Sequence, residues 1–113
     1  MNVRTITVNG KRWRLMYSGH IGNDKDGYCT PPDEPGRTIA IRSTLDGVRR
    51  LEVELHEMLH AADWSKDEEW VRTVAHDLAK VLWRLGYRCE SSTRLMSWSV
   101  IARPPCTRRS GLR

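Results

Sequence analysis

The chain has 113 residues, a length that builds one domain around one modest hydrophobic core. Hydrophobic residues make up 39% of it and five residues are tryptophan, a composition that favours a folded chain over a disordered one. The formal net charge is +5, but residues 1–90 hold 14 basic and 14 acidic residues, so the whole excess comes from the C-terminal arginines. A neutral body weakens the argument for a nucleic-acid partner that rests on the high isoelectric point.

The N-terminal residues 1–6 lack the apolar core of a signal peptide. No run of 18 apolar residues occurs anywhere in the sequence, so we expect no membrane span and a cytoplasmic location. The three cysteines, Cys29, Cys89 and Cys106, are odd in number and form no Cys-x-x-Cys pair. This spacing favours free thiols in a reducing compartment.

The first predicted elements are strands. Residues 4–17 are typical of a β-hairpin, because Asn9-Gly10 is the strongest two-residue turn signal and apolar residues alternate on both sides of it. Residues 18–37 contain four glycines, three prolines and several aspartates, which predicts a loop. His20 in this loop is a candidate metal ligand, although a lone loop histidine is more often simply solvated. Residues 38–42 then predict a short strand with Ile39 and Ile41 directed inward.

Two helices follow. Asp46 is a suitable N-cap for a first helix over about 47–63. Residues 65–68, Ser-Lys-Asp-Glu, have the pattern of a capping box that opens a second helix over about 66–85, which Gly86 ends as a C′ glycine. The short connection between the helices predicts an antiparallel pair.

The first helix contains the motif His56-Glu57-x-x-His60. Residues four apart lie about one turn apart on one helix face, so the two imidazoles can hold one Zn²⁺ from the same side. Glu57 lies beside the open side of such an ion, where its carboxylate can take a proton from a water molecule. The apolar residues of this helix form a stripe next to the histidines, which indicates that the pair borders the buried face.

A catalytic zinc site usually has three protein ligands, and the third must come from elsewhere. Asp63 follows on the same helix and is better placed to orient an imidazole or to close the helix end. Three candidates lie on the second helix. Glu68 belongs to its first turn, level with His60, at the edge of the apolar face. Glu69 and His76 lie about 80–100° away around that helix, and both remain alternatives.

The motif followed by a helix that opens Glu68-Glu69-Trp70-Val71 resembles the small, single-domain gluzincin-like zinc metallopeptidases of phages and bacteria, called minigluzincins or SprT-like proteins. The resemblance covers about residues 4–88. It implies that His56, His60 and Glu68 ligate Zn²⁺ and that Glu57 is the catalytic general base. In zinc peptidases of this kind the strand beside the metal helix often holds an extended substrate, a role that would fall here to residues 38–42.

The expected fold class is therefore α+β. A small antiparallel sheet, made of the hairpin and one more strand, would pack on the helix pair, followed by an extended C-terminal segment. We expect one zincin-like domain over 1–102 and a disordered basic tail over 103–113.

The expected function is zinc-dependent hydrolysis of a peptide or protein substrate through a metal-activated water. The alternative is a non-catalytic, zinc-stabilised binding module. The Arg-rich tail gives the only indication of a nucleic-acid partner, and such a tail is more often just solvated.

Overall fold

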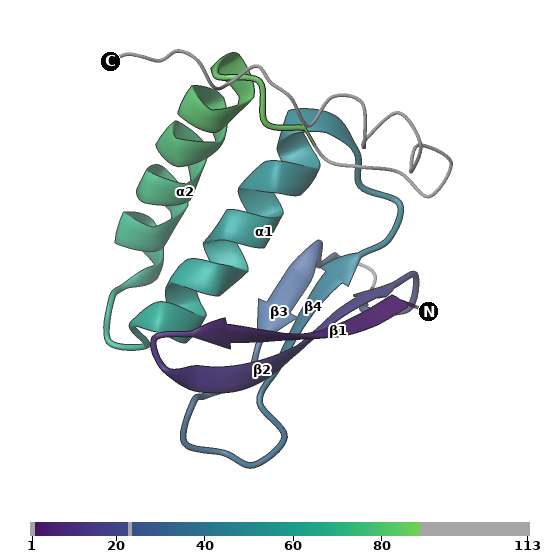
Figure 1. Cartoon of the computed structure of the whole chain (residues 1–113), viewed down its shortest axis with the longest axis vertical. Coiled ribbons are helices and arrows are strands. Elements are labelled where there is room, and N and C mark those ends of the chain that lie inside the picture. Colours follow the sequence, from purple (N-terminus) through teal and green to yellow (C-terminus); the bar gives the residue numbers. More distant parts are fainter. Residues whose placement is uncertain (1, 23, 89–113) are drawn as a thin grey trace.

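The computed structural model describes residues 2–22 and 24–88, which form a four-stranded sheet and two helices (Figure 1). The α+β class is confirmed. In chain order the elements are β1 (Asn2–Val8), β2 (Lys11–Ser18), β3 (Gly27–Cys29), β4 (Thr38–Arg42), α1 (Gly47–Ala62) and α2 (Glu68–Arg84).

The predicted hairpin is present as β1 and β2, and its register pairs Val8 with Lys11 and Ile6 with Trp13. Asn9 and Gly10 connect the strands with φ angles of 51° and 80°. Two successive residues with positive φ make the tight turn whose twist matches that of the strands, and Asn-Gly tolerates this backbone best. The turn is also anchored to α1, because the Asn9 side-chain amide donates a hydrogen bond to the Ala62 carbonyl over 2.9 Å.

The sheet differs from the expected one in polarity and in strand count. Its order is β1-β2-β4-β3, with β4 parallel to β2 and antiparallel to β3. The predicted purely antiparallel sheet is therefore wrong, because the long connection over residues 19–37 returns the chain to the start of the sheet and β4 enters in the same direction as β2. The prediction of a plain loop over 18–37 is also wrong, since β3 lies within it.

The core lies between the sheet and α1. Trp13, Ile39 and Ile41 are at most 1% exposed, which confirms the inward orientation predicted for the two isoleucines. From α1, Val53 and Ala61 complete this cluster. α2 lies beside α1 and contacts none of the four described strands, so the sheet, α1 and α2 follow one another as three layers (Figure 1).

Both helices end at capped residues close to the predicted bounds. Asp46 caps α1 as expected, and its carboxylate accepts a hydrogen bond from the Gly47 amide. The capping box predicted at residues 65–68 is wrong, because Asp67 caps α2 by accepting from the Trp70 amide over 2.8 Å. At the other end Gly86, with φ of 105°, is the predicted C′ glycine.

Several expectations concern residues outside the described part of the chain. These are the extended C-terminal segment, the basic tail over 103–113, and the thiols of Cys89 and Cys106. Within the described residues, Cys29 is a free cysteine. Neither helix there combines the length and the apolar character that crossing a bilayer requires.

Candidate metal centre

α1 presents His56 and His60 to the same neighbour. Their ring centroids are 5.0 Å apart, as expected for residues one turn apart on a helix. Both side chains are mostly buried, with 20% and 17% exposure. Burial lowers the pKa of His56, although the carboxylate of Glu68 acts in the opposite direction. A lowered pKa keeps this imidazole neutral at physiological pH, which is the form that can ligate a metal.

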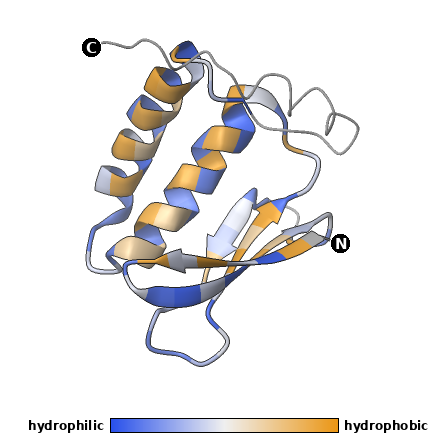
Figure 2. Cartoon of the chain, in the orientation of Figure 1, coloured by the Kyte–Doolittle hydropathy of each residue, from blue (hydrophilic) through white to orange (hydrophobic). Residues whose placement is uncertain are grey.

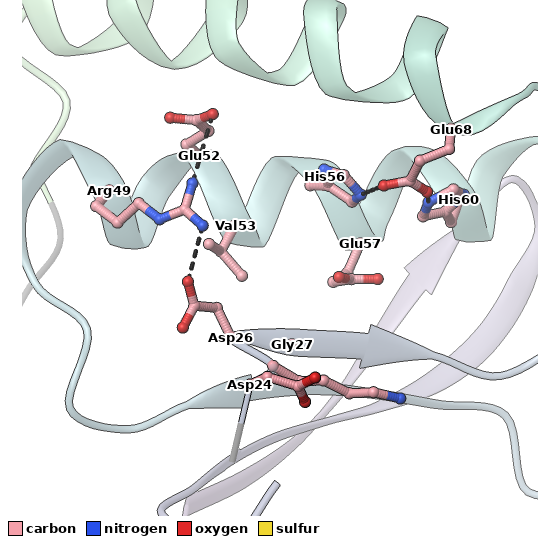
Figure 3. Close-up of a pocket in the computed structure, with 11 residues that line it drawn as sticks. Asp24, Asp26, Gly27, Arg49, Glu52, Val53, His56, Glu57, His60 and Glu68 are labelled. Carbon is pink, nitrogen blue, oxygen red and sulfur yellow. Dashed lines mark hydrogen bonds and ion pairs between the residues drawn. The ribbon is translucent and has the colours of Figure 1, made fainter. Parts of the chain in front are cut away.

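Glu68 comes from the first residue of α2 and lies between the two histidines. One carboxylate oxygen is 3.0 Å from His56 Nε2 and the other is 3.0 Å from His60 Nε2 (Figure 3). The short connection between the helices places the start of α2 level with the end of α1. His60 and Glu68, eight positions apart in the sequence, therefore face each other. Glu68 therefore does not turn back to the Ser65 amide, which instead donates to Asp63.

The three side chains suit one metal ion. Their ligand atoms all lie within 4.8 Å of one another. In a tetrahedral zinc site with bonds of 2.0–2.2 Å, neighbouring ligand atoms are about 3.4 Å apart. The 3.0 Å separations are close to that value, and two imidazole nitrogens with one carboxylate are a donor set that Zn²⁺ accepts in catalytic sites. The donors present thus fit zinc.

Glu57 lies on the sheet side of the same helix, next to the histidines. It is only 8% exposed. The pKa of Glu57 is raised to about 7, mainly by desolvation and to a smaller extent by repulsion from Glu68. The charge of Lys25 acts in the opposite direction. A carboxyl group whose pKa lies near neutrality can both take and release a proton at physiological pH, which is the property a general base and acid requires.

β3 passes close over this carboxyl group because of Gly27. A Cβ atom on Gly27 would lie 2.9 Å from the Ala40 carbonyl oxygen, 3.0 Å from Val53 Cγ1 and 3.3 Å from Glu57 Cγ. Separations this short leave no room for a side chain. Glycine at this position therefore lets the strand and α1 approach, and it fixes the distance between β3 and Glu57.

The cluster of His56, His60 and Glu68 occupies one end of a longer pocket (Figure 3). One wall of the pocket comes from residues 24–27, which lead into β3, and the opposite wall comes from α1, which carries the histidines. At the far end Arg49 binds Asp26 over 2.7 Å and lies 3.6 Å from Glu52. The pocket lining is thus charged along its whole length, and its acids are partly neutralised by their own ion pairs.

The other candidates from the sequence do not join this cluster. Glu69 points to solvent and pairs with Arg72 over 2.7 Å. His76 Nδ1 lies 3.4 Å from a carboxylate oxygen of Glu52, and Glu52 is one helical turn before His56 on α1. Asp63 is the C-cap of α1 and accepts from Ser65, and His20 is exposed.

Gly27, Lys25 and Arg49 are site residues that the sequence did not reveal. They are assembled only when β3 adds to β4, and a three-residue strand within a Gly- and Asp-rich segment gives no periodic signal. No local pattern could have found them.

No family model matches this chain, and no curated protein and no solved structure is similar to it. The geometry of the site is accordingly the basis for the functional proposal that follows.

Proposed function

We propose that this protein is a zinc-dependent peptidase in which His56, His60 and Glu68 hold the metal and Glu57 is the general base. The observation that carries the proposal is the convergence of the three ligand atoms within 4.8 Å, beside a buried carboxyl group on the same helix. Zn²⁺ bound there would polarise a substrate carbonyl and make a water molecule more acidic. Glu57 takes the proton from the attacking water and delivers it to the leaving amine.

The position of the strands supports an extended peptide as the substrate. The sequence suggested residues 38–42 as the substrate strand, but β4 lies between β2 and β3 and has no free edge. β3 is the edge strand on the side of the metal centre. The Thr30 amide and the Asp26 carbonyl bond to β4, so in the alternating antiparallel pattern the backbone groups of Gly27 and Cys29 point outward.

An extended peptide that pairs with this outer edge would lie along the pocket and pass Glu57. Main-chain hydrogen bonds from Gly27 and Cys29 would hold the peptide independently of its sequence. The Cys29 thiol does not compete as a nucleophile, because burial, together with the charge of Glu57, raises its pKa to about 12. This arrangement favours hydrolysis of an unfolded or extended segment.

Replacement of the base tests the proposal. We expect Glu57→Gln to bind one zinc per chain, as the parent does, and to lose peptide cleavage. The matched control is Glu69→Gln, since Glu69 is 78% exposed and pairs only with Arg72 among the described residues; it should keep both properties. Zinc is measured by elemental analysis and cleavage with a peptide library followed by mass spectrometry. Cleavage by Glu57→Gln at the parent's rate would contradict the mechanism.

A second function, a zinc-stabilised binding module, is favoured by the way the site joins the helices. α2 contacts none of the four described strands, and Glu68 on its first residue reaches across to both histidines of α1. Metal bound there would fasten α2 to the rest of the domain, so that binding energy becomes folding energy. A parent protein that binds zinc, cleaves no library peptide and loses much of its thermal stability on chelation would establish this function instead.

A further inference from the structure

A row of apolar side chains on α2 stays partly exposed to solvent in the described part of the chain. Leu78, Val81 and Leu85 are 39%, 54% and 65% exposed, and Val74 before them is half-buried. We call these four residues the α2 seam. Figure 2 shows hydrophobic bands recurring along α2, which stands at the edge of the molecule. A continuous apolar row of this kind on a helix indicates an interaction surface.

The α2 seam adjoins the face that packs on α1 and extends the apolar surface of the helix beyond it. That face consists of Val71, Ala75 and Ala79, all 0% exposed. At 100° per residue the four seam residues fall within an arc of about 60°, whose centre lies about 90° around the helix from Ala75. The apolar surface of α2 is therefore wider than the part that α1 covers.

The spacing of the seam specifies the kind of partner. Val74, Leu78, Val81 and Leu85 follow one another at intervals of four, three and four residues. This 3.5-residue repeat keeps a seam facing a second helix, and it is the pattern of helices that pack along their length. A surface that binds a strand or an irregular segment would not need such a repeat.

We propose that the occupant is a second copy of this chain, with the two α2 helices antiparallel about a two-fold axis. The axis would lie between Leu78 and Val81, so that Leu78 packs against the partner's Val81 and Val74 packs against the partner's Leu85. Each contact then occurs twice, as two-fold symmetry requires. The seam is only about 16 Å long. We therefore expect a weak dimer, whose population depends on the protein concentration.

Charges beside the seam select the antiparallel arrangement. Asp77 and Arg84 flank it on the same side, and neither has an ion pair or a side-chain hydrogen bond among residues 2–22 and 24–88. In the antiparallel dimer Asp77 of one copy lies within one turn of Arg84 of the other, twice. In a parallel dimer the residue across from Asp77 would be Leu82, which offers no charge.

Arg88, the last of the described residues, packs on the side of α2 away from the seam. After Gly86 the Arg88 guanidinium lies 4.0 Å from the centre of the Trp83 ring. Trp83 lies about 170° around the helix from the centre of the seam. The Arg88 guanidinium, at the end of the described residues, thus lies on the face of α2 opposite the seam. Glu68 lies on the α1 side, so the metal centre stays accessible in the dimer.

Mass measurements on the full chain over a range of concentrations test the proposal. We expect the mass found by sedimentation velocity to rise from the 13.1 kDa of one chain toward twice that value, with and without zinc. Val81→Glu should keep the protein monomeric where the parent is dimeric. The matched control is Thr73→Glu, which adds the same charge at an exposed position about 110° from the seam centre and should dimerise like the parent. Circular dichroism confirms that each variant is folded.

Charge reversal tests the orientation. Asp77→Arg should weaken the dimer about tenfold, because two attractive pairs become repulsive, and the double variant Asp77→Arg/Arg84→Asp should restore the parent's dissociation constant. A parent that is monomeric at all concentrations overturns the proposal, as does a dimer unaffected by Val81→Glu. A double variant as weak as the single one overturns the antiparallel arrangement. None of these results depends on peptidase activity.

Discussion

The two sides of α1 are built differently, and the candidate metal centre lies where they meet. On the sheet side large residues fill the core, among them Trp13, Ile39 and Ile41, and Glu57 is buried beside them. On the α2 side the packing residues are small, since Ala75 and Ala79 allow the helices to approach closely. Glu57 therefore belongs to the core, whereas the candidate metal ligands His56, His60 and Glu68 join two helices.

This difference separates the two parts of the proposed site. Glu57, the proposed base, is fixed by the packing of the sheet side and is costly to bury. The three proposed ligands depend on α2, which contacts only α1 among the described elements, so we expect that their geometry can be disturbed without unfolding the sheet. Three predictions probe the two sides, beginning with the largest expected effect.

The first compares two fully buried aliphatic side chains, one from each side of α1. Ile41→Ala on the sheet side should lower the free energy of unfolding by about 4 kcal/mol, because it leaves a cavity in the main core. Val71→Ala on the α2 side should cost about 2 kcal/mol, since fewer methyl groups are removed. Both positions are 0% exposed. Urea denaturation of the metal-free variants measures both values, and equal losses would contradict the two-sided description.

The second concerns the cost of burying Glu57. In the metal-free protein its pKa is about 7, whereas the ordinary value is 4.5. Between these pH values the folded state keeps a proton that the unfolded state releases, so the stability of the fold decreases as pH rises through this range. The loss should reach at most about 3 kcal/mol at pH 8.

Glu57→Gln carries no titrating proton and should lack this loss. We therefore expect the variant to be more stable than the parent at pH 8 and nearly equal to it at pH 4, in denaturant titrations with a chelator present. Glu69→Gln, on the exposed side of α2, should follow the parent at both pH values. The same pH dependence in the parent and in Glu57→Gln would show that Glu57 is not buried as a neutral acid.

The third and smallest effect concerns the ligand from α2. Glu68→Ala should weaken zinc binding by at least about tenfold, as the removal of an oxygen that supports a metal does, while leaving the fold intact. Glu69→Ala and His76→Ala should bind zinc like the parent, because their side chains pair with Arg72 and Glu52 instead. Competition titration with a zinc chelator measures all three. Weaker zinc binding in His76→Ala but not in Glu68→Ala would mean that the ligands are three histidines.

Local sequence patterns were sufficient to predict the structural features that depend only on residues close together in the sequence. Asn9-Gly10 predicted the hairpin, Asp46 and Gly86 predicted the helix ends, and the spacing of His56 and His60 placed two imidazoles on one face. Each of these features arises within about one turn or one loop of chain, where backbone preference and side-chain spacing decide the outcome. The three side chains expected to hold zinc are also the three that the structure brings together.

The tertiary structure alone decided the features that join distant segments. The parallel pairing of β4 with β2, the strand β3 inside a predicted loop, and the approach of Gly27 to Glu57 all depend on contacts between segments far apart in sequence. The same holds for the position of Glu68, rather than Glu69 or His76, beside the two histidines, which follows from the register of α2 against α1. Sequence periodicity gives the faces of each helix, but the rotation and the height at which two helices meet are set by the packing of all the side chains between them.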